Sequence, residues 1–230
     1  MKKIPVEDIV AFAPFCGTFP IDVDPVYANS DHPENHFGQI YHKQARIWGY
    51  RDLVKIVLLT AKRLHDAHGW TLVVKDCLRP VEAQERMIDT PIVKANPHWI
   101  EEPRFLSGPG QGGHPRGMAI DLDVEGIDFG TAFDHFGPES HRQYELSQEV
   151  RRNRGILEEA MVRAANDFGL PMLPLPQEWW DFRFPASYTN EYAALSDDDL
   201  LAHQKMVSEA QRIDLKPDDR VLEELSRFGV

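Results

Sequence analysis

Two short clusters of ionisable residues offer the side chains best suited to catalysis. His114 and Asp121 stand seven residues apart with Gly117 between them, and Glu178 stands three residues before Asp181. A hydrolytic zinc centre needs three protein ligands, an open position for water and a general base. The two clusters supply these parts if His114, Asp121 and Asp181 bind the metal and Glu178 acts as the base. A histidine would be the commoner residue in the place of Asp181.

The chain must bend at both clusters for these side chains to meet. Residues at an odd separation on a regular strand point to opposite faces of the sheet, and both pairs have odd separations. Gly117 permits a turn, so that a histidine in a loop can approach an aspartate on the strand that follows. The second pair requires a bend or bulge near Trp179 or Trp180.

The wider pattern of apolar residues predicts an α+β fold, because helical spacing and short β-branched or alternating runs both occur. The expected helices are residues 48–68, 80–88, 147–168, 196–212 and 218 onward, and the expected strands are 71–75, 118–124 and 178–184. Residues 90–113 contain Pro91, Pro97, Pro103 and Pro109 together with four glycines. This segment predicts a long loop that forms a wall or lid of an active site.

The composition argues against several classes of function. The chain has 230 residues and a formal net charge of −12, whereas nucleic acids and anionic membranes select clustered Lys and Arg. No apolar run approaches the roughly 20 residues needed to cross a bilayer. Cys16 and Cys77 provide no disulfide framework, and Cys77 is expected to be a small buried residue rather than a reactive thiol. With an N-terminus that does not resemble a cleaved signal, the chain is expected to be cytoplasmic.

Further motifs extend along most of the chain. They are Tyr27-Ala, His36-Phe-Gly, Leu78-Arg-Pro, His114-x-x-Gly-x-Ala-x-Asp, Gly130-Thr-x-Phe-Asp-x-Phe, Arg152-x-Arg-x-x-Leu and Glu178-Trp-Trp. In this order, between about residues 22 and 184, they resemble the D-alanyl-D-alanine dipeptidases of the vancomycin-resistance type. Those proteins are zinc enzymes related to DD-carboxypeptidases and to the hedgehog signalling domain. An ordered series is far more specific than any single motif.

The resemblance implies a particular architecture. A central antiparallel sheet with flanking helices would hold the metal site at the mouth of the sheet, within a metallodipeptidase domain at residues 1–189. Residues 190–230 would form a C-terminal helical extension. This extension is expected either to pack on the domain or to form a subunit interface in a homo-oligomer.

The resemblance also implies roles in catalysis. His114 and Asp121 would be metal ligands, and Glu178 would take a proton from water and later return it to the departing amine. Arg79 would stabilise the oxyanion of the tetrahedral intermediate, because its guanidinium group is permanently charged and has several donors.

Two further residues would form the substrate pocket. Asp134 would pair with the free α-ammonium group of a dipeptide, and Tyr27 would line a small, closed pocket that admits dipeptides and not polymer. The family typically has serine at the position of Gly112, two residues before the ligand histidine. One hydrogen bond to the substrate is therefore either missing here or provided by the backbone.

Asp181 is the largest departure, because the family motif reads Glu-Trp-Trp-His. Asp181 either binds the metal, leaves it weakly held, or marks a protein that binds peptides without catalysis. We favour ligation, since an aspartate oxygen and a histidine Nδ1 both lie one atom beyond Cγ, and carboxylates are accepted zinc ligands. If Asp181 does not bind the metal, the third ligand must be sought elsewhere, for example near His32 or His36. The oxygen-rich ligand set favours Zn²⁺ less strongly over Mn²⁺, Fe²⁺ or Co²⁺.

The expected activity is the hydrolysis of D-Ala-D-Ala or a closely related dipeptide. The alternatives are the same chemistry on another dipeptide or peptidoglycan fragment, and a catalytically silent binder of D-amino-acid peptides. In each case the partner is a small peptide, and neither nucleic acid nor membrane is expected to bind.

Overall fold

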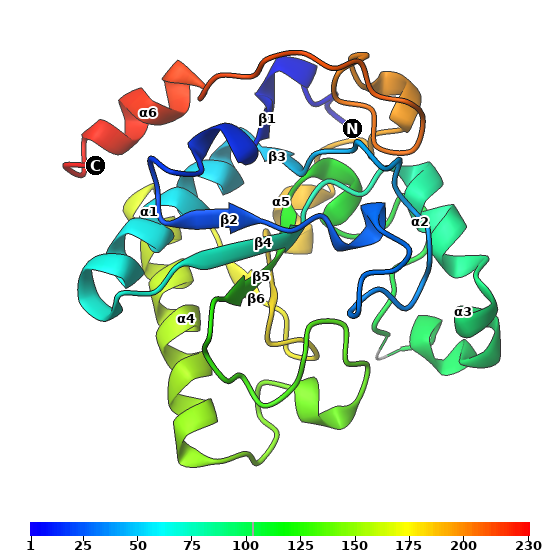
Figure 1. Cartoon of the computed structure of the whole chain (residues 1–230), viewed down its shortest axis with the longest axis horizontal. Helices are drawn as coiled ribbons and strands as arrows, with labels where there is room; N and C mark the ends of the chain where they lie inside the picture. Colours follow the sequence, from blue (N-terminus) through cyan, green and yellow to red (C-terminus); the bar gives the residue numbers. More distant parts are fainter. Residues whose placement is uncertain (103) are drawn as a thin grey trace.

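A five-stranded sheet lies at the centre of the computed structural model, which describes residues 1–102 and 104–230 (Figure 1). The strands are β1 (Ile9–Ala11), β2 (Ile21–Val23), β3 (Trp48–Tyr50), β4 (Leu72–Asp76), β5 (Ala119–Val124), β6 (Leu173–Pro174) and β7 (Asp181–Arg183). The helices are α1 (Arg51–His68), α2 (Val81–Ile88), α3 (Pro91–Ala95), α4 (Gln148–Asp167), α5 (Ala186–Thr189) and α6 (Asp219–Ser226). The α+β class predicted from the sequence is confirmed.

The central sheet is mixed, with the strand order β2-β4-β5-β7-β6. Antiparallel pairing joins β4, β5, β7 and β6, as expected, but β2 pairs with β4 in parallel. The expectation of a wholly antiparallel sheet is therefore wrong at this edge. The chain between β2 and β4 includes α1 and is long enough for the crossover that a parallel pair needs. Strands β1 and β3 form a separate antiparallel pair.

Two long helices pack against each other beside the sheet, α1 and α4 (Figure 1). Helix α1 ends where predicted, because Gly69 adopts a left-handed conformation and donates its amide to the carbonyl of His65 at 2.8 Å. Helix α4 begins at Ser147, whose side chain accepts a hydrogen bond from the amide of Val150. The helix predicted from residue 48 begins only at Arg51, since β3 takes the first three residues.

The proline-rich segment 90–113 is more ordered than a simple loop. It contains α3 and a short 3₁₀ helix at Pro97–Ile100, because proline is well suited to the first turn of a helix. Pro103, one of the residues that predicted the loop, lies outside the described residues. The part from Arg104 to Gly113 has no regular structure and borders the candidate site.

The C-terminal segment packs along the rest of the chain rather than forming two helices. Helix α6 is present and packs against α1, but the helix predicted for residues 196–212 is wrong beyond a 3₁₀ turn at Asp197–Asp199. The Asp197 carboxylate accepts hydrogen bonds from the amides of Met206, Val207 and Ser208. It thereby folds this segment back on itself. Among the described residues, no helix combines the length and apolar character that crossing a membrane requires.

Candidate active site

His114 is held in the orientation that a metal ligand needs. It begins a 3₁₀ turn, His114–Arg116, which ends at Gly117 in a left-handed conformation with φ of 62°. A Cβ atom on residue 117 would lie 2.8 Å from the amide nitrogen of Tyr50, so only glycine fits. His114 Nδ1 lies 2.8 Å from the carbonyl oxygen of Cys77. Because a carbonyl only accepts, Nδ1 carries the hydrogen, and Nε2 is the ring nitrogen that faces the site.

Two aspartates face this nitrogen from neighbouring strands. Asp121 on β5 and Asp181 on β7 are directly paired in the antiparallel register. Their Oδ2 atoms lie 3.7 Å and 3.4 Å from His114 Nε2. Trp179 and Trp180 form a turn just before β7, so the bend predicted for the second cluster is confirmed, and β7 is shorter than the predicted strand at residues 178–184.

Asp76 is a third aspartate at this site, and the sequence reasoning missed it. It ends β4 and pairs in register with Asp121. Ligand atoms of Asp76, His114 and Asp121 all lie within 4.8 Å of one another, and the three residues are buried. Asp76 also accepts hydrogen bonds from Tyr41 Oη at 2.6 Å and from Arg79 Nε and Nη2 at 2.9 and 2.7 Å. Its position at the end of a predicted strand, three residues before Arg79, was the available signal.

Arg183 is a second residue that the sequence reasoning missed. Its Nε donates to Asp181 Oδ1 at 2.7 Å, and its Nη2 donates to Asp181 Oδ2. Burial alone would raise the pKa of Asp181, but the charge and hydrogen bonds of Arg183 outweigh this and hold that pKa below its ordinary value. Asp181 thus lies beside His114, as predicted, while a guanidinium group occupies both of its oxygens. Its ligation of a metal stays a prediction.

Glu178 and Arg79 line the same small cavity as His114. Glu178 is buried, and burial together with the neighbouring Asp181 raises its pKa well above the ordinary value. The Arg79 guanidinium lies over the Tyr27 ring, 5.2 Å from its centre, and its Nη2 is 3.6 Å from Asp121 Oδ2. Asp76 therefore fixes Arg79 at the wall of the cavity.

Asp134 and Tyr27 line the same cavity and contact each other. Tyr27 Oη donates to Asp134 Oδ2 at 2.6 Å. Burial raises the pKa of Asp134 to about 7, although the hydrogen bond from Tyr27 opposes the shift. Among the described residues, Asp134 is the only one other than glycine with a positive φ, 58°. Such a conformation is uncommon away from glycine and often marks a functional position.

The inner cavity, as we name the space enclosed by these side chains, has a volume of about 20 Å³. Six of the seven residues predicted from the sequence line it, namely Tyr27, Arg79, His114, Asp121, Asp134 and Glu178. Asp181, the seventh, reaches it through its contact with His114. The structure therefore brings all seven together from segments spread over most of the chain.

The inner cavity suits a divalent cation. Asp121 Oδ1 is buried and has no hydrogen-bond partner among the described residues, and such an oxygen is costly unless a cation or water satisfies it. Carboxyl groups also outnumber guanidinium groups here. The carboxyl groups belong to Asp76, Asp121, Asp134, Glu178 and Asp181, and the guanidinium groups belong to Arg79 and Arg183. Imidazole and carboxylate donors fit zinc and the related divalent ions.

Gly112 and Ser107 resolve the other departure from the family pattern. Gly112 has a φ of 80°, and a Cβ atom placed on it would lie 3.1 Å from Ser107 Oγ. A neighbouring segment thus brings a hydroxyl close to where a side chain at position 112 would begin. Ser107 also lines the inner cavity, so a hydroxyl is available there despite the glycine.

The comparison with known families agrees with this geometry. The family model described as D-ala-D-ala dipeptidase matches residues 21–206, and the chain belongs to this family of peptidases, which are usually zinc-dependent. The buried Asp76, His114 and Asp121 could hold a metal ion. The comparison with curated proteins gave no match.

Proposed function

We propose that the protein hydrolyses D-Ala-D-Ala or a closely related dipeptide in a metal-dependent reaction. The observation that carries the proposal is the meeting of His114 Nε2, the unpartnered Asp121 Oδ1 and the Glu178 carboxyl in one buried cavity. The family match supports peptide hydrolysis. The choice of substrate rests on the family match and on the buried Asp134.

His114 and Asp121 would hold the metal, with an oxygen of Asp181 or Asp76 as the third ligand. We propose Zn²⁺ as the ion, with Mn²⁺, Fe²⁺ or Co²⁺ as alternatives that oxygen-rich sites accept. When bound, such an ion polarises the scissile carbonyl and lowers the pKa of water. Asp181 must loosen its contacts with Arg183 to take part, whereas Asp76 must loosen those with Arg79 and Tyr41.

Glu178 would transfer the proton. As a base it takes a proton from the water that attacks the carbonyl carbon, and as an acid it gives that proton to the amide nitrogen when the C–N bond breaks. The products are two free amino acids. Burial and the charge of Asp181 raise the pKa of Glu178, which favours the return of the proton at neutral pH.

Arg79 would bind the carbonyl oxygen as negative charge develops on it. The two hydrogen bonds to Asp76 restrict its guanidinium before substrate arrives. A preorganised cation of this kind stabilises the transition state without reorganising during the reaction. The contact with Tyr27 further limits where it can lie.

Asp134 and Tyr27 would bind the free ammonium group of the dipeptide. Asp134 is buried, so its carboxylate gains most when a cation reaches it. An N-acylated peptide has no cation for this position. A buried anchor for a free ammonium group supports a short peptide that is cleaved next to its amino end rather than a polymer.

One observation favours a second candidate function, the binding of peptides without catalysis. Arg183 donates to both oxygens of Asp181 and could keep this residue from a metal. A metal held by too few ligands would bind weakly. Metal content separates the two candidates, since only the peptidase requires a stoichiometric divalent ion.

The decisive experiment combines metal analysis with turnover. Purified protein is analysed for bound metal and then assayed with each candidate ion on D-Ala-D-Ala, L-Ala-L-Ala and a tripeptide ending in D-Ala-D-Ala. We expect one divalent ion per chain and hydrolysis of the first peptide only. Hydrolysis of the tripeptide in preference to the dipeptide would refute the role of Asp134, and a metal-free, inactive protein that still binds dipeptide would support the second candidate.

A further inference from the structure

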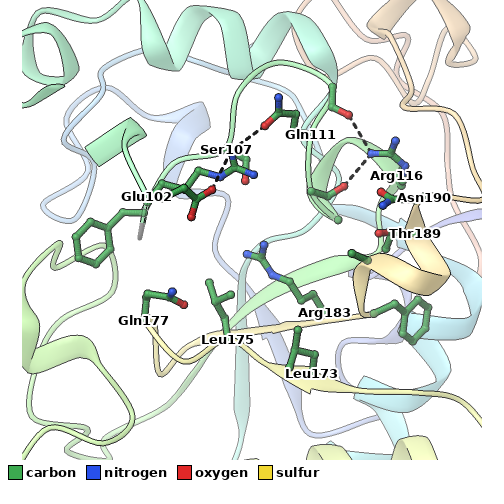
Figure 2. A pocket seen from close by; sticks show the side chains of 17 residues that line it. Glu102, Ser107, Gln111, Arg116, Leu173, Leu175, Gln177, Arg183, Thr189 and Asn190 are labelled. Carbon is green, nitrogen blue, oxygen red and sulfur yellow. Dashed lines mark hydrogen bonds and ion pairs between the residues drawn. The ribbon is translucent and has the colours of Figure 1, made fainter. Parts of the chain in front are cut away.

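A second and larger cavity adjoins the inner one. This outer pocket has a volume of about 470 Å³, within the range of about 300–1,000 Å³ that is usual for small-molecule sites. Both cavities are lined by Phe105, Ser107 and Arg183. Figure 2 shows Arg183 reaching into the outer pocket between Leu175 and the loop that carries Gln111. The two spaces therefore meet at the Arg183 guanidinium.

Gly112 lies beside Ser107 and Arg183, two of the residues that line both cavities. A Cβ atom on Gly112 would lie 3.1 Å from Ser107 Oγ and 3.8 Å from Arg183 Nη1. Arg116 holds the loop that carries this glycine, since its Nη1 donates to the carbonyl oxygens of Gly110 and Gly112 at 3.0 and 2.8 Å (Figure 2). The upper wall of the outer pocket is thus a fixed surface.

The outer pocket presents an arginine nitrogen that lacks a partner. Arg183 uses Nε and Nη2 for Asp181, while its Nη1 has no hydrogen-bond partner among the described residues. Arginine side chains at positions 104, 116 and 183 line the pocket. Glu102 pairs with Arg104 and Asp181 pairs with Arg183, so the pocket keeps a small excess of positive charge on a chain whose net charge is −12.

The charges at the two ends set the direction of a bound peptide. In the proposed function the ammonium group lies at Asp134, and the rest of the peptide must extend away from it. Arg183 repels an ammonium group and attracts a carboxylate. The leaving residue of the peptide therefore points toward Arg183 and the outer pocket.

We infer that the outer pocket binds the leaving part of the substrate and selects a leaving group that carries an additional carboxylate. This inference rests on the proposed function and names its substrate class more closely. A methyl side chain would leave most of the 470 Å³ unfilled. The additional carboxylate would belong to an acidic side chain on the second residue of a dipeptide, where it could reach Arg183 Nη1.

Binding to a variant that cannot turn over substrate tests this inference directly. Calorimetry on metal-loaded Glu178→Gln would compare D-Ala-D-Glu with D-Ala-D-Gln. We expect D-Ala-D-Glu to bind at least about tenfold more tightly than its neutral analogue, the scale of one charge-assisted hydrogen bond. Equal affinities of the two dipeptides would overturn the inference.

Two substitutions of Leu173 provide a matched control. Leu173 lines the outer pocket and is 39% exposed, so a polar side chain is tolerated there. Introduced into the same background, Leu173→Glu should lower the preference for the acidic ligand at least about threefold, whereas Leu173→Gln should keep it. An unchanged preference in Leu173→Glu would place the carboxylate outside this pocket and overturn the inference.

Turnover separates this inference from the proposed function. If the wild type hydrolyses D-Ala-D-Ala but no acidic ligand is preferred, the proposed function stands and the role of the outer pocket fails. If no peptide is hydrolysed while the acidic ligand is still preferred and Leu173→Glu lowers the preference, the pocket assignment stands and the proposed function fails.

Discussion

The molecule contains two clusters with the same residue types and very different surroundings. Each has two carboxylates and one histidine whose ligand atoms lie within 4.8 Å of one another. The inner cluster is Asp76, His114 and Asp121, and the peripheral cluster is Asp24, His32 and Glu34. The inner cluster is buried, whereas the peripheral one is only partly buried.

The peripheral cluster already contains its own cation. Lys75 Nζ lies 2.9 Å from Asp24 Oδ2 and 2.6 Å from Glu34 Oε2, and His32 Nε2 lies 3.2 Å from the same Asp24 oxygen. A lysine thus balances the carboxylates where a metal would have to bind. The inner cluster leaves Asp121 Oδ1 without a partner in the described part of the chain. Lys75 thus contacts both carboxylates of the peripheral cluster, whereas Arg79 in the inner cluster bonds to Asp76 and leaves this oxygen of Asp121 available to a metal.

The largest expected effect distinguishes His114 of the inner cluster from His32 of the peripheral cluster. His114→Ala should remove the metal and lower turnover about a thousandfold or more, because the bound ion stabilises transition-state charge by several kcal/mol. His32→Ala should change neither quantity, since Lys75 neutralises its neighbours. Metal content and kcat/KM measured on both variants provide the test. Retention of full metal in His114→Ala would reverse the assignment of the two clusters.

A second comparison concerns Glu178 of the inner cavity and Glu34 of the peripheral cluster. Glu178→Gln should keep the metal and lose at least about a hundredfold in kcat, the usual scale for a general base. Glu34→Gln serves as the control and should retain full kcat, because Glu34 pairs with Lys75. Full activity of Glu178→Gln would remove Glu178 from the mechanism.

Asp134 should make dipeptide binding depend on pH. Its pKa is raised to about 7 by burial, and only its ionised form attracts an ammonium group. Dipeptide affinity should therefore fall about tenfold for each pH unit below 7 in the wild type, and Asp134→Asn should bind weakly at every pH. Titration of Glu178→Gln and of the double variant Glu178→Gln/Asp134→Asn between pH 5 and 8 measures this. A pH-independent affinity in Glu178→Gln would exclude Asp134 as the anchor.

The free energy of unfolding provides an independent measurement of the raised pKa of Asp134. A carboxyl group whose pKa is higher in the folded than in the unfolded chain binds more protons when folded, so its burial costs stability as the pH rises from about 4 to 7. Asparagine has no such cost and tolerates the positive φ of this position. Asp134→Asn should therefore unfold at a higher temperature than the wild type at pH 8, with a difference on the order of 4 kcal/mol that disappears near pH 4. An equal difference at both pH values would contradict the raised pKa.

The bends at the candidate site and several helix termini could be predicted from the sequence. The odd separations at both clusters required bends, and Gly117 and the turn at Trp179 and Trp180 provide them. The C-terminus of α1 at Gly69 and the N-terminus of α4 at Ser147 were also predictable, because local chemistry determines them.

Long-range contacts account for what was missed. The helix predicted from Ser196 onward fails because the Asp197 carboxylate binds amides nine to eleven residues away, an arrangement that helical spacing does not encode. Asp76 escaped notice because its importance depends on pairing with Asp121 across strands. Arg183 escaped notice because no motif marks an arginine two residues after Asp181 on the same strand. The parallel edge strand β2 likewise depends on the path of the chain through α1.

The smallest expected effect concerns Arg183, which gives Asp181 the kind of partner that Lys75 gives the peripheral cluster. If Arg183 competes with the metal for Asp181, Arg183→Met should tighten Zn²⁺ binding by about three- to tenfold, equivalent to roughly 0.6–1.4 kcal/mol. Without metal, the same variant should be less stable by about 3–5 kcal/mol, because the buried Asp181 carboxylate loses its partner. The rise in Tm on adding Zn²⁺ should therefore be larger than in the wild type.

Arg104→Met is the matched control, since Arg104 lines the outer pocket and bonds to Gln111 rather than Asp181. It should leave both the Zn²⁺ affinity and the metal-dependent rise in Tm unchanged. Combining Arg183→Met with Asp181→Ala completes the comparison, because removal of the carboxylate should abolish the gain in affinity. A gain that persists in the double variant would mean that Arg183 repels the metal directly, and Asp76 would then be the stronger candidate for the third ligand.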